Sequence, residues 1–104
     1  MFALYQSSLI VLEPAMSRFY LSHPVKDYDA WKPVFDADEA RRQSAGLSTV
    51  GVFREANDGN QVLVVLEGND SQAMRDMLAD PSLGEAMKKA GVMAPPQTFA
   101  GEEL

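Results

Sequence analysis

The sequence contains no cysteine and only one histidine, His23. Without cysteine the chain cannot form disulfides, thiolate nucleophiles or cysteine-based zinc and iron–sulfur sites. A single histidine also leaves no imidazole cluster for a metal ion. We therefore expect no metal site. The lack of cysteine fits a reducing cytoplasm, which is the localisation we expect.

Basic residues are few and scattered. The chain has 9 Lys and Arg against 15 Asp and Glu, which gives a net charge of −6, and its only basic doublets are Arg41-Arg42 and Lys88-Lys89. Such a chain repels phosphate polymers and anionic lipids at long range. Neither nucleic acid nor a membrane is an expected partner.

Long apolar runs are also missing. No stretch reaches the ~18 consecutive apolar residues that a membrane span requires. A hydrophobic content of 46% is nevertheless too high for a disordered chain. A length of 104 residues then fits a single compact domain.

The N-terminal residues differ from the rest. No Lys or Arg precedes Arg18, so this apolar segment lacks the positive region of a signal peptide. Because Met16 stands directly before the first predicted strand, we predict that residues 1–16 are an extension outside the fold. Residues 17–104 would form the domain. For residues 1–15 two interpretations stay open: an upstream start or added segment, and a docking arm.

The first half of the domain predicts a strand, a helix and a hairpin. An aromatic strand over 17–22 ends before His23-Pro24. Asp27 can cap a helix over 28–45 that Gly46 closes. Strands over 47–56 and 61–68 follow, with Asp58-Gly59 as the tight turn between them.

The second half predicts two short helices and a last strand. Asp70 or Ser71 caps the first helix, and Asp80-Pro81 ends it and starts a second that Gly91 closes. Pro95-Pro96 then precedes a strand over 97–101. The resulting order is βαββαβ, an α+β, ferredoxin-like domain with helices on one face of a four-stranded antiparallel sheet.

The predicted strands are apolar on both faces. Val62, Val64 and Leu66 point one way, whereas Leu63 and Val65 point the other. Helices can cover only one of these faces, and a second copy of the sheet is the simplest cover for the other. We therefore expect a homodimer through the sheet face, a dimeric α+β barrel.

The predicted helix over 28–45 has charges within its apolar stripe. Asp38 and Arg42 are four residues apart with the acid first, the favourable order for an intrahelical pair. They either satisfy each other at the edge of the core or orient a polar group of a ligand in a cavity. Tyr28 and Trp31 of the same stripe could wall a pocket for a flat organic molecule, although Trp31 also fits a core position.

His23 and Arg54 are the candidate catalytic residues. With an unperturbed pKa of about 6.5, His23 can exchange protons near neutral pH, and the end of a strand is a common place for a site residue. The alternative is a structural or solvated histidine. Arg54 could receive an anionic substrate. Its alternative partner Glu67 fits poorly, because the predicted turn places Arg54 beside Leu63.

Other chemistry lacks support. Asp36 and Asp38 project about 200° apart on a helix, which does not suit a shared metal ion. Glycine-rich nucleotide motifs, a phosphate loop, a nucleophile elbow and a zinc-protease motif are absent, so we expect no cofactor. The methionines of the second half form either an adaptable ligand-binding surface or core filler: Met74, Met77, Met87 and Met93.

Three segments carry a resemblance to a known group of proteins. Residues 25–36 (VKDYDAWKPVFD), 38–46 (DEARRQSAG) and 78–92 (LADPSLGEAMKKAGV) resemble small bacterial proteins of the dimeric α+β barrel superfamily, over about 17–102. Relatives by fold include antibiotic biosynthesis monooxygenase-like proteins, stress-responsive barrel proteins and muconolactone isomerase-like enzymes. The resemblance implies a dimeric barrel but brings no catalytic motif, and a fold alone cannot choose a reaction.

Two functional hypotheses follow. In the first, the barrel binds a small aromatic or apolar molecule and acts as a cofactor-free oxygenase or isomerase. His23 would move a proton, Arg54 or Arg42 would hold developing negative charge, and Trp31 with Tyr28 would stack on the substrate. In the second, the protein is a noncatalytic stress-response or structural dimerisation domain. A ligand-sized cavity reached by His23 and Arg54 would favour the first.

Overall fold

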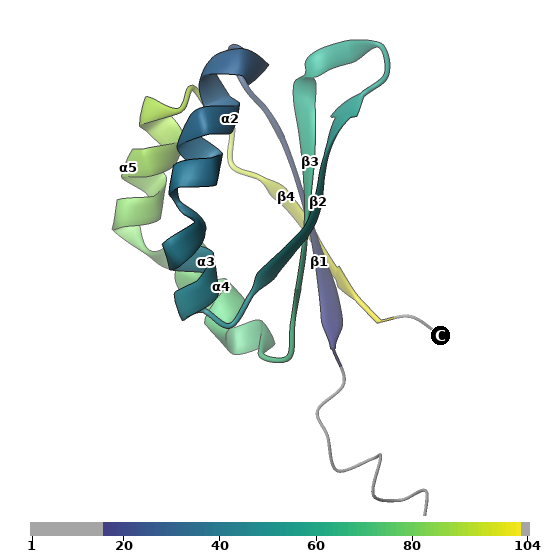
Figure 1. The fold of residues 1–104 in the computed structure, drawn as a ribbon, viewed down its shortest axis with the longest axis vertical. Coiled ribbons are helices and arrows are strands. Elements are labelled where there is room, and N and C mark those ends of the chain that lie inside the picture. Colours follow the sequence, from purple (N-terminus) through teal and green to yellow (C-terminus); the bar gives the residue numbers. More distant parts are fainter. Residues whose placement is uncertain (1–15, 103–104) are drawn as a thin grey trace, which may run out of the picture.

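The computed structural model describes residues 16–102, and the predicted N-terminal extension falls almost entirely outside them. The described chain forms a four-stranded antiparallel sheet in the order β2-β3-β1-β4. All helices lie on one side of this sheet (Figure 1). The predicted ferredoxin-like βαββαβ order is confirmed, with the following bounds: β1 Ser17–Pro24, α2 Tyr28–Ala37, α3 Glu39–Ser44, β2 Ser48–Glu55, β3 Asp58–Gly68, α4 Ser71–Ala79, α5 Pro81–Lys89 and β4 Gln97–Gly101.

Aspartate caps fix where three of the helices begin. The side chain of Asp27 accepts a hydrogen bond from the backbone N–H of Asp29 at the start of α2. Asp70 and Asp80 cap α4 and α5 in the same way. Such side chains satisfy backbone donors that have no partner within the helix. After α3 and α5 the chain turns at Gly46 and Gly91, whose φ angles of 75° and 84° suit glycine.

The predicted helix over 28–45 is two helices, with a break at Asp38. The carbonyl of Phe35 accepts from the N–H of Asp38 at 3.1 Å and from Nη1 of Arg42 at 3.0 Å. The regular i+4 partner of that carbonyl would be the N–H of Glu39, so the guanidinium replaces a helical bond. A side chain from the next helix thus supports the break.

The hairpin turn lies earlier than predicted. Glu55 pairs with Asp58, so the turn is Ala56-Asn57, and Arg54 lies opposite Val62 rather than Leu63. Gly59 does not adopt a positive φ. A Cβ atom on Gly59 would instead lie 2.5 Å from the guanidinium of Arg54, which donates to the Gly59 carbonyl at 2.9 Å. Gly59 is therefore needed because it leaves room for the side chain of Arg54, and not because it forms the turn. The tendency of an Asp-Gly pair to form turns gave no sign of this role.

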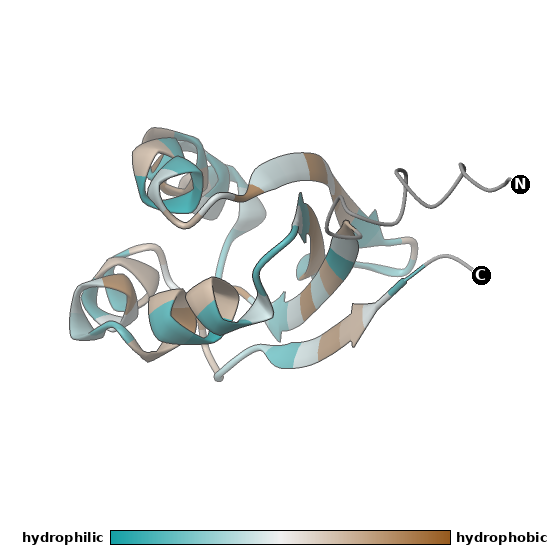
Figure 2. Cartoon of the chain, turned by 90° about the horizontal axis from the view of Figure 1, so that it is seen from below, coloured by the Kyte–Doolittle hydropathy of each residue, from teal (hydrophilic) through white to brown (hydrophobic). Residues whose placement is uncertain are grey.

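The sheet has a helix-covered face and an uncovered face, and both are apolar. Val62, Val64 and Leu66 are at most 2% exposed and pack against the helices. On the other face the rings of Phe53 and Phe99 are 53% and 66% exposed. Figure 2 shows hydrophobic residues along the strands, with the helices on one side of the sheet. The predicted alternation in β3 is therefore confirmed.

None of the helices within residues 16–102 combines the length and apolar character needed to cross a membrane.

Candidate functional site

His23 lies inside β1, not at its open end as we predicted. The strand continues through Pro24, and His23 pairs with Val62 on the helix-covered face. Its side chain is only 6% exposed. Proline does not end the strand, because β1 and β3 still pair at Pro24 and Gln61, while the neighbouring Val25 and Lys26 use their N–H groups to bond Asn60 and Gly91.

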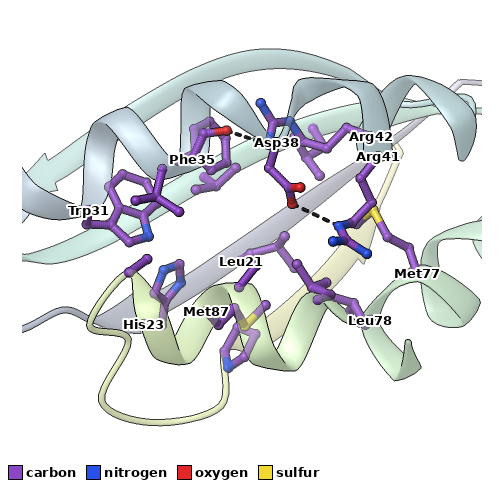
Figure 3. Close-up of a pocket in the computed structure, with 17 residues that line it drawn as sticks. Leu21, His23, Trp31, Phe35, Asp38, Arg41, Arg42, Met77, Leu78 and Met87 are labelled. Atoms are coloured by element: carbon purple, nitrogen blue, oxygen red, sulfur yellow. Dashed lines mark hydrogen bonds and ion pairs between the residues drawn. The ribbon is translucent and has the colours of Figure 1, made fainter. Parts of the chain in front are cut away.

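A small cavity lies between the sheet, α2–α3 on one side and α4–α5 on the other (Figure 3). Its volume is about 70 Å³. Of its 17 lining residues only four are polar: His23, Asp38, Arg41 and Arg42. The cavity is therefore an apolar space with its few polar groups at particular positions, as is typical of small-molecule sites.

His23 brings an unsatisfied polar group into this cavity. Neither Nδ1 nor Nε2 has a hydrogen-bond partner among residues 16–102, although both atoms are buried. Burial lowers the pKa of His23 below its ordinary value of 6.5. At neutral pH the imidazole is therefore uncharged, with one nitrogen that can donate and one that can accept. Buried polar atoms rarely lack partners, so this histidine needs a polar group from a ligand or a water molecule.

Aromatic rings form the wall beside His23. Trp31 meets the imidazole edge to face at a centroid distance of 5.6 Å and stacks on Phe35 at 5.0 Å. Trp31 is 3% exposed and lines the cavity. The two interpretations of Trp31 are therefore compatible, since it belongs to both the core and the pocket wall.

Arg42 is a buried cation that donates hydrogen bonds from two of its three nitrogens, Nε and Nη1. It donates to the Phe35 carbonyl and to Oγ1 of Thr49, and its guanidinium lies 3.8 Å from the centroid of the Phe35 ring. Burial lowers the pKa of Arg42, and the nearby charge of Asp38 opposes that change. Arginine stays protonated under these conditions. Its charge is compensated by the carbonyl, the hydroxyl and the ring rather than by a carboxylate in contact.

Asp38 pairs with Arg41 and not with Arg42, so the structure does not contain the intrahelical pair of our first interpretation. Nε of Arg41 lies 2.8 Å from Oδ2 of Asp38, and its Nη1 donates to Oγ of Ser82 at 2.6 Å. The same guanidinium is 3.5 Å from Asp80. The break at Asp38 turns the carboxylate toward the i+3 residue while Arg42 points to Phe35. Sequence reasoning missed Arg41, and its i+3 spacing from Asp38 was the available signal.

The structure places Tyr28 and Arg54 outside the cavity lining. The guanidinium of Arg54 lies 4.1 Å from the centroid of the Tyr28 ring, and Tyr28 contacts Trp31 at a centroid distance of 5.8 Å. Four of the six predicted site residues thus line one cavity, namely His23, Trp31, Asp38 and Arg42. The other two stack on each other next to its aromatic wall.

The fold is shared with several solved structures. A Bordetella bronchiseptica protein assigned as an antibiotic biosynthesis monooxygenase superposes with a TM-score of 0.71 at 16% identity, over 86% of this chain and 98% of its own. SnoaB, a cofactor-independent oxygenase from Streptomyces nogalater, gives 0.67 at 16% identity, over 86% and 94%. A NIPSNAP-like domain protein from Burkholderia xenovorans gives 0.64 at 15% identity, over 88% of each chain.

These likenesses define the class of fold. The chain shares the ferredoxin-like fold of these antibiotic biosynthesis monooxygenase-like and NIPSNAP-like structures. At these identities the likeness concerns the fold alone. No protein-family model matches the chain, and no curated protein matches it in sequence.

Proposed function

We propose that the protein is a homodimeric barrel that binds a small, uncharged, aromatic or otherwise apolar molecule beside His23, and that it acts as a cofactor-free oxygenase or isomerase. The unpartnered imidazole of His23 in an apolar cavity is the observation that carries this proposal. A ligand hydroxyl or carbonyl would satisfy the imidazole, while the apolar lining would receive the rest of the ligand.

The charges around the cavity favour an uncharged ligand. The cationic groups in the lining, Arg41 and Arg42, already have acceptors. Burial also keeps His23 neutral at pH 7. A carboxylate entering this space would lose its hydration and would compete with the acceptors that these guanidinium groups already contact, which is costly. We therefore propose that an uncharged ligand binds more tightly than an anionic one.

The state of His23 suits proton transfer. A neutral imidazole can accept a proton from an enolic or phenolic hydroxyl, which leaves an anion beside an imidazolium and no net change of charge in the cavity. An electron-rich anion of this kind is the species that isomerises or reacts with oxygen. The cofactor-independent oxygenase among the structural relatives makes oxygen chemistry the first reaction to test.

A noncatalytic role is the second candidate function, because the cavity is small. A space of about 70 Å³ is roughly half of the ~150 Å³ that holds benzene in another protein. An aromatic ligand would require Met77 and Met87 to repack, which methionine side chains do readily. A stress-response or structural dimerisation domain would need no such change.

The uncovered face of the sheet supports the dimer. Phe53 and Phe99 lie over Gly51 and Gly101, where a Cβ atom would come within 3 Å of the rings. Tyr20 meets Phe99 at a centroid distance of 5.8 Å. The result is a flat aromatic surface on an antiparallel sheet, and a second copy offers an identical surface to cover it.

Binding of phenol and benzoate tests the ligand class. The fluorescence of Trp31, the only tryptophan, reports on the cavity. We expect phenol to bind and benzoate to bind at least about tenfold more weakly. The His23→Leu variant should lose most of the phenol affinity because it removes the polar partner. Equal binding of both probes, or unchanged phenol binding in the variant, would contradict the proposal.

A further inference from the structure

An open cleft lies directly outside the His23 cavity. This outer cleft has a volume of about 710 Å³ and lies over α5 and the segment that leads into β4. Leu78, Met87 and Pro96 line both the cavity and the outer cleft. These three side chains therefore form the partition between the two spaces.

Met87 is the part of this partition that can move. It is half-buried on α5 and lies beside His23 in Figure 3. The ends of α5 are held, because Asp80 caps its start and the Gly91 carbonyl accepts from the N–H of Lys26 at 2.8 Å. A passage would consequently open by rotation of the Met87 side chain rather than by movement of the helix. Methionine is unbranched and adopts many rotamers, so this rotation costs little.

The outer cleft suits an apolar chain. Its lining is mostly aliphatic, with Val92, Met93 and Pro95 beside the partition residues. Its charged residues, Glu85 and Lys88, have opposite signs and bring no net charge. Among the described lining residues, His23 is the one whose buried side-chain nitrogens have no hydrogen-bond partner, which makes it the place for the polar group of a ligand.

We propose that the cavity and the outer cleft form one elongated binding site gated by Met87, and that the ligand carries one uncharged polar group, placed at His23, and an apolar tail that passes Met87 into the cleft. This inference rests on the proposed function and adds the shape of the ligand to it. Met87 thereby sets the length of ligand that the site accepts.

Phenol and 4-butylphenol are the probes for this proposal, with Trp31 fluorescence as the readout. In Met87→Ala the passage is wider as well as the cavity, so the affinity for 4-butylphenol should rise by about tenfold more than the affinity for phenol. Met77→Ala is the matched control because Met77 lines the cavity but not the outer cleft. It should change the affinities of the two probes by the same factor.

A second variant, with a larger side chain at the partition, tests the same proposal without relying on Met87→Ala. Leu78→Phe narrows the partition and should weaken the binding of 4-butylphenol by about tenfold more than the binding of phenol. Equal effects of Met87→Ala on both probes, or the same selective gain in Met77→Ala, would overturn the elongated site. If phenol binds in a manner that depends on His23 but chain length has no effect, only this inference fails. If neither phenol nor 4-butylphenol binds, the proposed function fails with it.

Discussion

A single buried imidazole distinguishes the candidate site from ordinary core. Within residues 16–102 nothing hydrogen-bonds to the imidazole of His23, which meets Trp31 edge to face in a mostly apolar cavity. A histidine kept for stability would have a partner for at least one nitrogen. The cost of burying both nitrogens thus calls for a partner from a ligand or from a buried water molecule.

Replacing His23 by leucine separates stability from binding. Because an unsatisfied buried polar group costs about 1–3 kcal/mol, the free energy of unfolding of His23→Leu should equal or exceed that of the native chain by up to about that amount. Urea unfolding measures this difference. A loss of more than about 2 kcal/mol would indicate that the imidazole stabilises the fold through contacts that a leucine cannot make.

The same residue predicts a pH dependence. The pKa of His23 is about 6.5 in the unfolded chain and lower in the folded chain, so the unfolded chain binds more protons below pH 6.5. The free energy of unfolding should therefore fall as the pH drops through about 6.5, and it should fall less in His23→Leu. Urea unfolding at several pH values gives the comparison. Parallel curves for both proteins would refute the lowered pKa.

The sequence alone identified His23 as a candidate site residue, but it did not predict what surrounds the side chain. His23 stood out as the only histidine. Its burial depends on β1 continuing through Pro24, which only the pairing with β3 establishes. The partner of Asp38 could not be predicted either, because it depends on Arg42 turning toward Phe35 and Thr49.

The α2–α3 break is the element that places Arg41 and Arg42 at the cavity. Arg42 replaces a helical hydrogen bond at the Phe35 carbonyl, and Arg41 links the start of α3 to Ser82 at the start of α5. The Arg41 contact links α3 to α5 across the cavity. The break thus positions two of the four polar residues that line the site.

Arg42→Lys tests the support of this break. A lysine lacks the planar fork that reaches both the Phe35 carbonyl and Thr49, so a buried cation would lose a hydrogen bond. We expect a loss of about 1.5–3 kcal/mol in the free energy of unfolding, measured in urea. The control is Arg75→Lys, since Arg75 is exposed and bonds only its helical neighbour Gln72, and it should stay within about 0.5 kcal/mol. Equal effects of the two substitutions would contradict this account.

The element order was predictable because it depends on local signals. Aspartate caps, the Asp80-Pro81 start and the glycines at 46 and 91 mark helix ends within a few residues. The hairpin turn was misplaced by comparison, since Gly59 resembles a turn glycine but accommodates Arg54. A contact of this kind between two particular side chains produces no recognisable pattern in the sequence.

At the scale of the whole molecule, the sheet divides the apolar residues between two surfaces. One surface forms the core and the cavity, whereas the aromatic surface around Phe53 and Phe99 is exposed in a single chain. The alternation of Leu63 and Val65 with Val64 made both surfaces predictable. Which surface the helices cover became clear only from the structure.

Phe53→Glu tests the proposed dimer. Phe53 is 53% exposed, so the charge should leave the fold intact and separate the two sheets. Light scattering should give twice the 11.4 kDa chain mass for the native protein and a single chain mass for the variant. Met93→Glu is the matched control, because Met93 is also exposed but lies in the outer cleft, and it should remain a dimer. A monomeric native protein would contradict the proposed assembly.

The imidazole of His23 gives the most direct test of the proposed site. Because the chain has one histidine, its ring signals in a nitrogen-15 NMR spectrum need no assignment. The measurement is a pH titration of these signals with and without phenol. We predict an imidazole whose pKa lies below 6.5 and nitrogen shifts that change as phenol binds. An imidazole that titrates at or above pH 6.5 and does not respond to phenol would contradict the account.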